Sequence, residues 1–187
     1  LESPPGKGIG LGCSSYLSGA GLPIYWNKMP HSGVQIKIDR GGGVTVFCGS
    51  ADIGQGSDSI LAGIVAEELG IHIKHVIIVT SDTDLTPVDL GSYSSRVTLM
   101  TGNAAIAAAR PLREKILSAA SEVMKIPEGD LTIRNGEVGM LDGSGEPVPF
   151  VDAVQWAEAK FGTLGSVGSY TPPRRGGEFK GAGIGPS

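Results

Sequence analysis

The clearest hydrophobic pattern in the chain is alternation on both sides of a glycine-rich turn. Residues 34–38 read Val-Gln-Ile-Lys-Ile, and residues 44–48 continue in extended form as Val-Thr-Val-Phe-Cys. Between them, the run Asp-Arg-Gly-Gly-Gly at 39–43 is typical of a tight turn. The pattern predicts a β-hairpin. A second hairpin is predicted over residues 131–141, around the turn Asn135-Gly136.

Three more segments have the character of strands. Residues 8–18 predict a first strand, whose small residues would let another backbone approach closely. Residues 76–79, Val-Ile-Ile-Val, form a continuous apolar run of the buried-strand type. Residues 164–170 predict a last strand.

Helical spacing appears in three other segments. An apolar stripe follows the glycines at 54 and 56 and ends at Gly70, which is typical of a helix C-cap. Residues 104–125 predict a second helix, with a kink or a restart at Pro111, and residues 150–161 predict a third. Hairpins interspersed with helices favour an α+β fold, a layered mixed sheet with two to three packing helices. The first stripe consists of Ile60, Leu61, Ile64, Val65 and Leu69, and the second of Leu112, Ile116, Ala120 and Val123.

Composition narrows the class of protein. The chain has 187 residues, 40% of them hydrophobic, a net charge of -4, 30 glycines and 12 prolines. We expect one domain over residues 1–173 and a Gly/Pro-rich tail over 174–187. The acidic balance argues against nucleic-acid binding, and no apolar run approaches the roughly 20 residues that span a bilayer. We therefore expect a soluble, cytoplasmic protein with neither nucleic acid nor membrane as partner.

The two cysteines, Cys13 and Cys48, have no metal-type or redox-type spacing. Each lies in a predicted strand, so we expect two buried free thiols. His72 and His75 lack the companions of a zinc site and are expected at the surface. The acidic residues Asp82, Asp84 and Asp89 are expected to be turn and capping residues, because the ligand pattern of a calcium loop is missing.

Two loops could carry chemistry. Gly54-Gln55-Gly56 lies between a predicted strand and a helix start, where backbone N–H groups can converge on an anion while the Gln55 amide contacts a polar heterocycle. A plain loop-to-helix turn is the alternative. The segment Ser94-Ser95-Arg96 combines hydroxyls with a guanidinium group, which suits a phosphate, whereas an exposed loop that caps a helix is the alternative there.

Both loops belong to a longer ordered set of motifs. The runs are Ala51-Asp-Ile-Gly-Gln-Gly56, Glu67-Glu-Leu-Gly70, Gly91-Ser-Tyr-Ser-Ser-Arg96 and Gly102-Asn-Ala104. In order and spacing they resemble the molybdenum-binding large subunit of the xanthine dehydrogenase/aldehyde oxidase family. The resemblance is strongest to the branch that reduces 4-hydroxybenzoyl-CoA.

The resemblance implies site residues and a cofactor. Gly54, Gln55 and Gly56 would hold molybdopterin, with the Gln55 amide on the pterin or its phosphate. Ser94, Ser95 and Arg96 would bind the pyrophosphate end, often extended as a cytosine dinucleotide. The family's glutamate beside molybdenum would follow this chain and its glutamine-bearing segment would precede it. We therefore expect an internal fragment, with no catalytic residue or metal ligand of its own and no turnover by itself.

The resemblance also implies partners and a reaction. The parent would be an oxidoreductase acting on a small aromatic or heteroaromatic substrate, by hydroxylation or by reductive dehydroxylation of 4-hydroxybenzoyl-CoA. The remaining domains of the large subunit would enclose the cofactor, and partner subunits would carry iron–sulfur clusters and FAD, because this chain has no cysteine cluster. The alternative is a non-catalytic module that binds an anion or a protein partner.

Overall fold

A four-stranded mixed sheet forms the centre of the fold. The computed structural model describes residues 4–14 and 32–171. Strands β1 (Ser32–Ile38) and β2 (Val44–Cys48) form the predicted antiparallel hairpin, in which Val34 pairs with Cys48 and Ile38 with Val44. Strand β3 (Val76–Thr80) runs parallel to β2, and β7 (Gly165–Tyr170) runs antiparallel to β1, which gives the strand order β3-β2-β1-β7.

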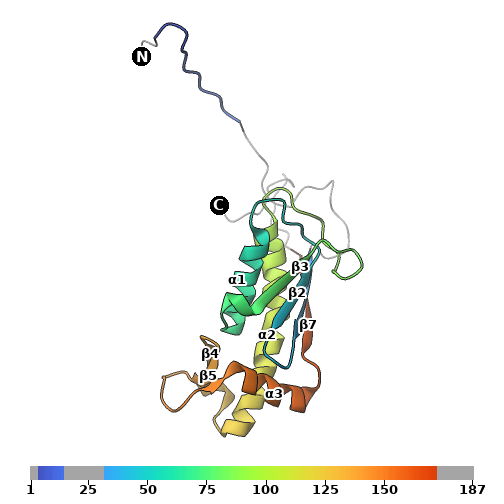
Figure 1. Ribbon diagram of the computed structural model, residues 1–187, viewed down its shortest axis with the longest axis vertical. Helices are drawn as coiled ribbons and strands as arrows, with labels where there is room; N and C mark the ends of the chain where they lie inside the picture. The colour runs from blue at the N-terminus through green and yellow to red at the C-terminus, as the bar shows by residue number, and fades with distance from the viewer. Residues whose placement is uncertain (1–3, 15–31, 172–187) are drawn as a thin grey trace, which may run out of the picture.

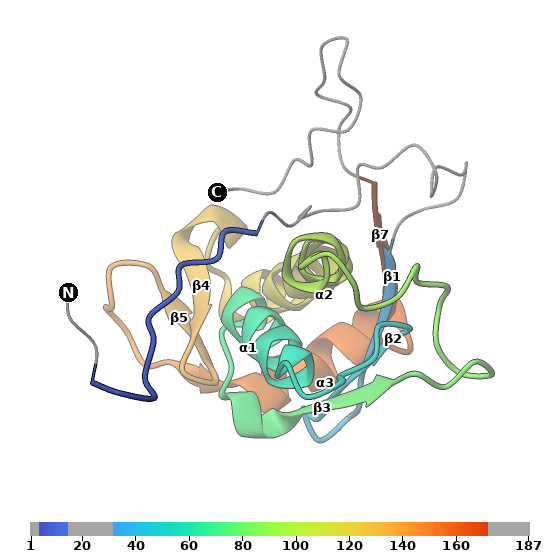
Figure 2. The ribbon, with the colours of Figure 1, turned by 90° about the horizontal axis from the view of Figure 1, so that it is seen from above.

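Two long helices cover one face of this sheet (Figures 1 and 2). Helix α1 (Ser57–Leu69) buries Leu61, Val65 and Leu69, while Ile60 of the same predicted stripe is 47% exposed. Helix α2 (Val97–Met124) begins seven residues earlier than predicted and continues through Pro111 as one element. This helix lies in close contact with β7 at Gly168. A side chain at Gly168 would collide with the backbone of Ala104, so only glycine fits there. The predicted helix 150–161 is α3 (Phe150–Phe161).

A second, smaller sheet closes the far end of the helices. It contains the predicted hairpin β4 (Leu131–Arg134) and β5 (Glu137–Met140), with β6 (Val148–Pro149) beside β5. Short 3-10 turns, η2 (Ile73–His75) and η3 (Glu128–Asp130), precede β3 and β4. Gly70 ends α1 in the left-handed conformation, and a side chain there would overlap the carbonyl of Ile133. The predicted α+β class and the three α-helices are confirmed in the described part of the chain, whereas the division of the strands into two sheets was not predicted.

The connections place two helix starts at one end of the domain. Strands β2 and β3 both finish at this end, α1 and α2 both begin there, and β1 starts there (Figure 1). We call it the upper end. Loops at the carboxyl ends of parallel strands and at helix N-termini commonly bind ligands. The candidate loops at 54–56 and 94–96 both lie here.

Two predictions about the N-terminal segment are wrong. In residues 8–14, the described part of the predicted first strand, the chain forms no strand and extends away from the body (Figure 1). Cys13 is accordingly exposed and only Cys48 is buried. The apolar side chains of Ile9 and Leu11 are 82% and 96% exposed, so the small residues beside them have no neighbouring backbone in the described part of the chain. Residues 15–18 of that segment and the tail 174–187 lie outside the described residues.

The burial of β3 differs from its sequence pattern. Residues 76–79 read as a strand enclosed on both faces, but β3 is an edge strand and Ile77 is 64% exposed. Among the helices of residues 4–14 and 32–171, none is long and apolar enough to cross a membrane.

Candidate functional site

The glycine loop, residues 49–56, is organised by the carboxylate of Asp52. Its Oδ1 accepts the N–H groups of Gly54 at 2.8 Å and Gly56 at 3.2 Å, and its Oδ2 accepts the N–H of Asp58 at 3.2 Å. Gly54 and Gly56 have φ angles of 103° and 78°, which favour glycine. These N–H groups converge on a carboxylate of the chain itself, so the loop geometry is built around Asp52.

Gln55 is bound within the same loop. Its amide nitrogen donates to the Ala51 carbonyl at 3.0 Å and to Ser57 Oγ at 2.9 Å, while its Oε1 accepts the N–H of Ile53 at 2.6 Å. Both amide hydrogens are thus used, and one lone pair of Oε1 is available to a ligand. The side chain is exposed. Gln55 can accept a hydrogen bond from a bound heterocycle, whereas donation would require it to leave the loop.

The serine turn, residues 91–96, has an uncommon backbone. Ser94 and Ser95 follow one another in the left-handed conformation, with φ angles of 49° and 53°. Non-glycine residues occupy this region infrequently, and such outliers concentrate at functional sites. Ser95 is exposed at the surface. Helix α2 begins directly behind it, with no acidic residue in its first turn and, within the described residues, no side-chain cap.

Arg96 does not face solvent. Its side chain is fully buried and its Nη1 donates to Asp89 Oδ1 and to the Gly91 carbonyl, each at 2.6 Å. Its Nη2 donates to Ser32 Oγ at 2.9 Å. The guanidinium group, which the sequence suggested as a phosphate ligand, is instead enclosed by partners from its own chain.

A buried polar network continues from this ion pair. Thr101 Oγ1 on α2 lies 3.2 Å from Asp89 Oδ2 and 3.2 Å from Ser32 Oγ on β1. Asp89 Oδ1 also accepts the N–H of Gly91 at 2.8 Å. The network therefore joins the first residue of β1, the loop after β3 and the first turns of α2.

The two loops meet at one carbonyl group. Ser92 Oγ donates to the Ala51 carbonyl at 2.5 Å, and Gln55 donates to the same oxygen. Two segments 41 residues apart are thereby joined at the upper end. The two candidate loops are therefore neighbours at this end of the domain.

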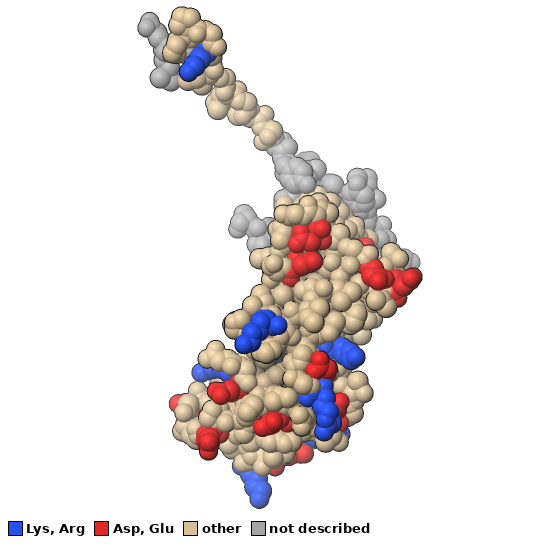
Figure 3. All heavy atoms as spheres, in the orientation of Figure 1, with Lys and Arg blue, Asp and Glu red and all other residues tan. Residues whose placement is uncertain are grey.

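The charges at the upper end are mainly acidic. In the view of Figure 3, the charged residues that are visible on the upper part of the body are Asp and Glu, and Lys and Arg lie lower. Hydrogen bonds from the backbone N–H groups of Gly54 and Asp58 lower the pKa of Asp52. Burial, and after it the charge of Asp52, raises the pKa of Asp58. On this face of the described residues, the groups that can donate to an anionic ligand at the upper end are therefore N–H and O–H dipoles.

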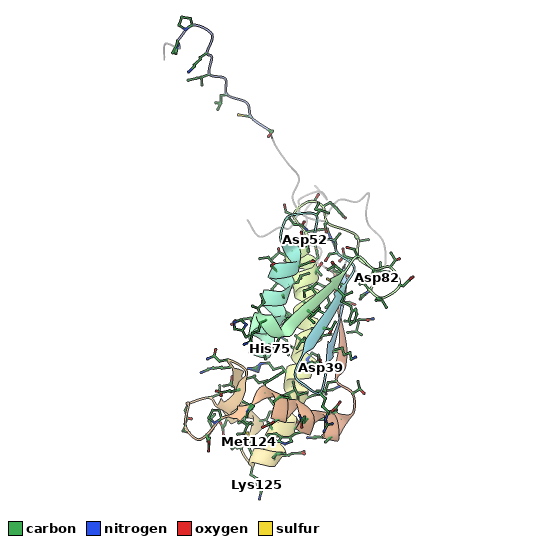
Figure 4. All side chains as sticks on the ribbon, in the orientation of Figure 1. Asp39, Asp52, His75, Asp82, Met124 and Lys125 are labelled. Carbon is green, nitrogen blue, oxygen red and sulfur yellow. The ribbon has the colours of Figure 1, made fainter. Side chains whose placement is uncertain are left out.

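The remaining candidates have structural roles. Asp82 accepts the N–H groups of Asp84 and Leu85, as expected of a turn residue, and lies at the upper end (Figure 4). His72 and His75 are exposed. In the described ranges, no three His, Cys, Asp or Glu residues are grouped so that they could hold a metal ion.

Sequence reasoning missed the role of Asp52, and it expected Asp89 only as a turn residue, without its buried ion pair to Arg96. Each stands two residues before a glycine, in Asp52-Ile53-Gly54 and in Asp89-Leu90-Gly91, and each accepts that glycine's N–H. The Asp-x-Gly spacing is a signal for an Asx turn. It was visible in the sequence and could have identified both residues as loop organisers.

Comparison with known proteins places the fold and its loops in a family. The model of the molybdopterin cofactor-binding domain matches residues 2–184, and the chain therefore belongs to this family of domains. The chain is 40% identical over 131 residues to the gamma subunit of the 6-hydroxypseudooxynicotine dehydrogenase complex of Paenarthrobacter nicotinovorans. These residues cover 70% of this chain and 16% of that subunit.

Two other relatives cover more of the chain. The xanthine dehydrogenase molybdenum-binding subunit of Escherichia coli O157:H7 is 32% identical, with coverage of 76% of this chain and 18% of the relative. The carbon monoxide dehydrogenase large chain of Afipia carboxidovorans is also 32% identical, covering 89% and 22%. The chain thus spans about a fifth or less of the length of these relatives.

Solved structures agree with this assignment. Quinoline 2-oxidoreductase from Pseudomonas putida 86 superimposes with a TM-score of 0.68 at 28% identity, covering 78% of this chain and 19% of that one. The Cu,Mo-CO dehydrogenase gives a TM-score of 0.67 at 29% identity, covering 76% and 18%. The arrangement of two sheets and three helices is therefore that of the corresponding part of these molybdenum enzymes.

Proposed function

We propose that the upper end of this domain binds the phosphate and pterin parts of a molybdopterin cofactor, and that the serine turn holds the phosphate. The observation that carries the proposal is the start of α2. It has neither a side-chain cap among the described residues nor an acid in its first turn, and the exposed Ser95 stands immediately before its N-cap residue Arg96. A helix N-terminus with adjacent hydroxyls suits a phosphate.

The glycine loop supports a second part of the proposal, contact with the pterin ring. Added Cβ atoms at Gly54 and Gly56 would meet nothing within 4 Å, so a flat ligand can approach this backbone closely. Asp52 already occupies the loop's N–H groups, which argues against phosphate here. Gln55 would instead accept a pterin N–H through its Oε1. These residues fit the cofactor if the phosphate lies at the serine turn.

For the whole protein, we propose the large subunit of a molybdenum-dependent oxidoreductase acting on an aromatic or heteroaromatic substrate. When bound, the cofactor would supply two-electron redox chemistry. The names of relatives support a multi-subunit assembly, since they include a complex subunit and a large chain. We further propose iron–sulfur and FAD partner subunits, a cytosine dinucleotide form of the cofactor, and 4-hydroxybenzoyl-CoA as a substrate to test. No described residue is assigned a catalytic role.

The test is cofactor loading of the full-length protein, made in cells supplied with molybdate. Molybdenum would be measured by mass spectrometry and pterin by fluorescence after oxidation, both per mole of protein. Ser95→Ala is expected to lower loading about tenfold, since a hydrogen bond to a charged group is lost. Gln55→Ala should lower it less.

Matched controls are Ser144→Ala, between β5 and β6, and Gln155→Ala in α3, both remote from the two loops. They should load like the unaltered protein. An unaltered protein without molybdenum or pterin would overturn the proposal. Equal loading of Ser95→Ala and Ser144→Ala would overturn the assignment of the serine turn and favour the partner-binding alternative.

A further inference from the structure

We propose that the buried Arg96–Asp89 ion pair is a clamp that holds Ser94 and Ser95 in the left-handed conformation needed for cofactor binding. Both residues of the clamp act as positioning residues and neither contacts the ligand. The inference rests on the proposed function, because the serine turn is its phosphate site.

The clamp closes the turn from behind. Arg96 stands at the end of the turn, and its Nη1 reaches back to Asp89 Oδ1 and to the Gly91 carbonyl at the beginning, both at 2.6 Å. Its Nη2 fixes the same group to Ser32 on β1 at 2.9 Å. The guanidinium fork thus binds partners at the beginning of the turn and on β1 at the same time, a geometry that the single ammonium group of a lysine does not reproduce.

The two residues of the turn that adopt a positive φ are serines, so they lack the conformational freedom that glycine would provide. Ser94 and Ser95 adopt φ angles of 49° and 53° one after the other, although both carry a Cβ atom. A conformation of this kind persists only where its surroundings impose it. The fixed distance between Gly91 and Arg96 supplies that constraint.

Stability alone does not explain the ion pair. Both side chains have an exposed fraction of 0%, so two charges have been removed from water. Well-packed apolar residues would commonly stabilise a core as well or better. The pair does fix a single geometry of the loop in front of α2, and that loop is where the ligand is proposed to bind.

The first test replaces the fork and keeps the charge. Arg96→Lys in the full-length protein leaves a cation opposite Asp89, so the fold is expected to survive. Loading of molybdenum and pterin should fall about tenfold, the size of effect usual for groups that support a ligand shell. The control is Arg110→Lys. Arg110 also pairs with a carboxylate, that of Glu68, but its side chain is 64% exposed, so loading should not change.

A rescue experiment separates positioning from general stabilisation. In the Arg96→Lys background, Ser94→Gly makes the left-handed conformation accessible and should restore part of the loading while Ser95 keeps its hydroxyl. Lys125→Gly relieves the same conformation, φ 56°, at the C-terminal end of α2, which is far from Asp52 and the upper end (Figure 4). It should stabilise the protein without restoring loading.

A second pair of variants leaves the clamp intact. Ser94→Val and Ser94→Gly both lack the hydroxyl, but valine strongly disfavours a positive φ. The valine variant should load several times less cofactor than the glycine variant, and far-ultraviolet circular dichroism should show both folded.

Three outcomes would overturn the clamp. They are loading of Arg96→Lys equal to that of Arg110→Lys, equal rescue by Lys125→Gly and Ser94→Gly, and equal loading of the two Ser94 variants. Each leaves the proposed function standing if the unaltered protein carries cofactor and Ser95→Ala carries markedly less. Absence of cofactor from the unaltered protein would instead overturn the proposed function itself.

Discussion

The glycine loop contains an Asp-x-Gly turn, another leads into the serine turn, and the two carboxylates are used in opposite ways. Asp52 and Asp89 each accept the N–H of the glycine two residues later at 2.8 Å. Asp52 then turns to the start of α1 and accepts two more N–H groups there. Asp89 turns inward and pairs with Arg96.

The difference decides which helix start can receive an outside anion. At α1 the carboxylate of Asp52 already lies at the positive end of the helix dipole and accepts the N–H groups of Gly56 and Asp58. At α2 the carboxylate is neutralised below the surface, and the turn in front of the helix is left to hydroxyls and backbone. A shared local motif therefore does not imply a shared ligand, because the second partner of each aspartate determines the outcome.

The strongest way to break this comparison is Asp89→Ala. The change leaves a buried guanidinium group without its counter-ion, which typically costs about 3–5 kcal/mol of unfolding free energy. Urea unfolding followed by circular dichroism would measure the loss.

Glu68→Ala is the matched control, since it removes the partner of a surface arginine and should cost under about 1 kcal/mol. If Asp89→Ala cost no more than this, the ion pair would not be the support of the serine turn.

Much of the fold, and the location of the two loops, could be predicted from sequence periodicity. The hairpins at 34–48 and 131–141 and the helix at 150–161 are confirmed, because period-2 and period-3.6 patterns there coincide with one buried face. The α+β class followed from their order. The loops were located for the same reason, since each stands where a strand-type or polar run gives way to a helix.

What periodicity could not supply was the identity of contacts between distant segments. In the sequence Arg96 resembled an exposed phosphate ligand, because no neighbouring residue reveals its partner Ser32. Ser32 is 64 residues away, and its Oγ accepts a hydrogen bond from the guanidinium group. The start of α2 was placed at 104 because the hydroxyl-rich residues before it have modest helix propensity, which burial of Val97 and Met100 overrides. Residues 8–14 failed as a strand because small residues permit the close approach of another backbone but do not provide one.

A smaller effect is expected when the carboxylate of the glycine loop is removed. Asp52→Asn should lower the thermal midpoint at pH 7 by less than Asp89→Ala, because Asp52 lies in an exposed loop. The difference from the unaltered protein should also depend on pH.

The pKa of Asp52 is lowered from its ordinary 3.8 by backbone hydrogen bonds, so its contribution is complete above that value and is lost as the pH falls through the lowered pKa. Thermal unfolding between pH 2 and 7 would measure this. A difference between the two proteins that stayed constant down to pH 2 would mean that the charge of Asp52 does not organise the loop.

The smallest effect concerns the thiol beside the glycine loop. Burial raises the pKa of Cys48 to about 11, and Ser50 donates to its Sγ at 3.7 Å. At pH 8 only about one molecule in a thousand carries that thiolate, so a disulfide reagent should modify the exposed Cys13 rapidly and Cys48 slowly.

Asp52→Asn should accelerate the slow phase by less than about tenfold, since opening one surface loop requires only part of the global unfolding free energy. Arg110→Lys should leave it unchanged. Equal slow phases in the unaltered and Asp52→Asn proteins would show that the glycine loop keeps its closed form without Asp52, and its internal anion would then no longer distinguish it from the serine turn.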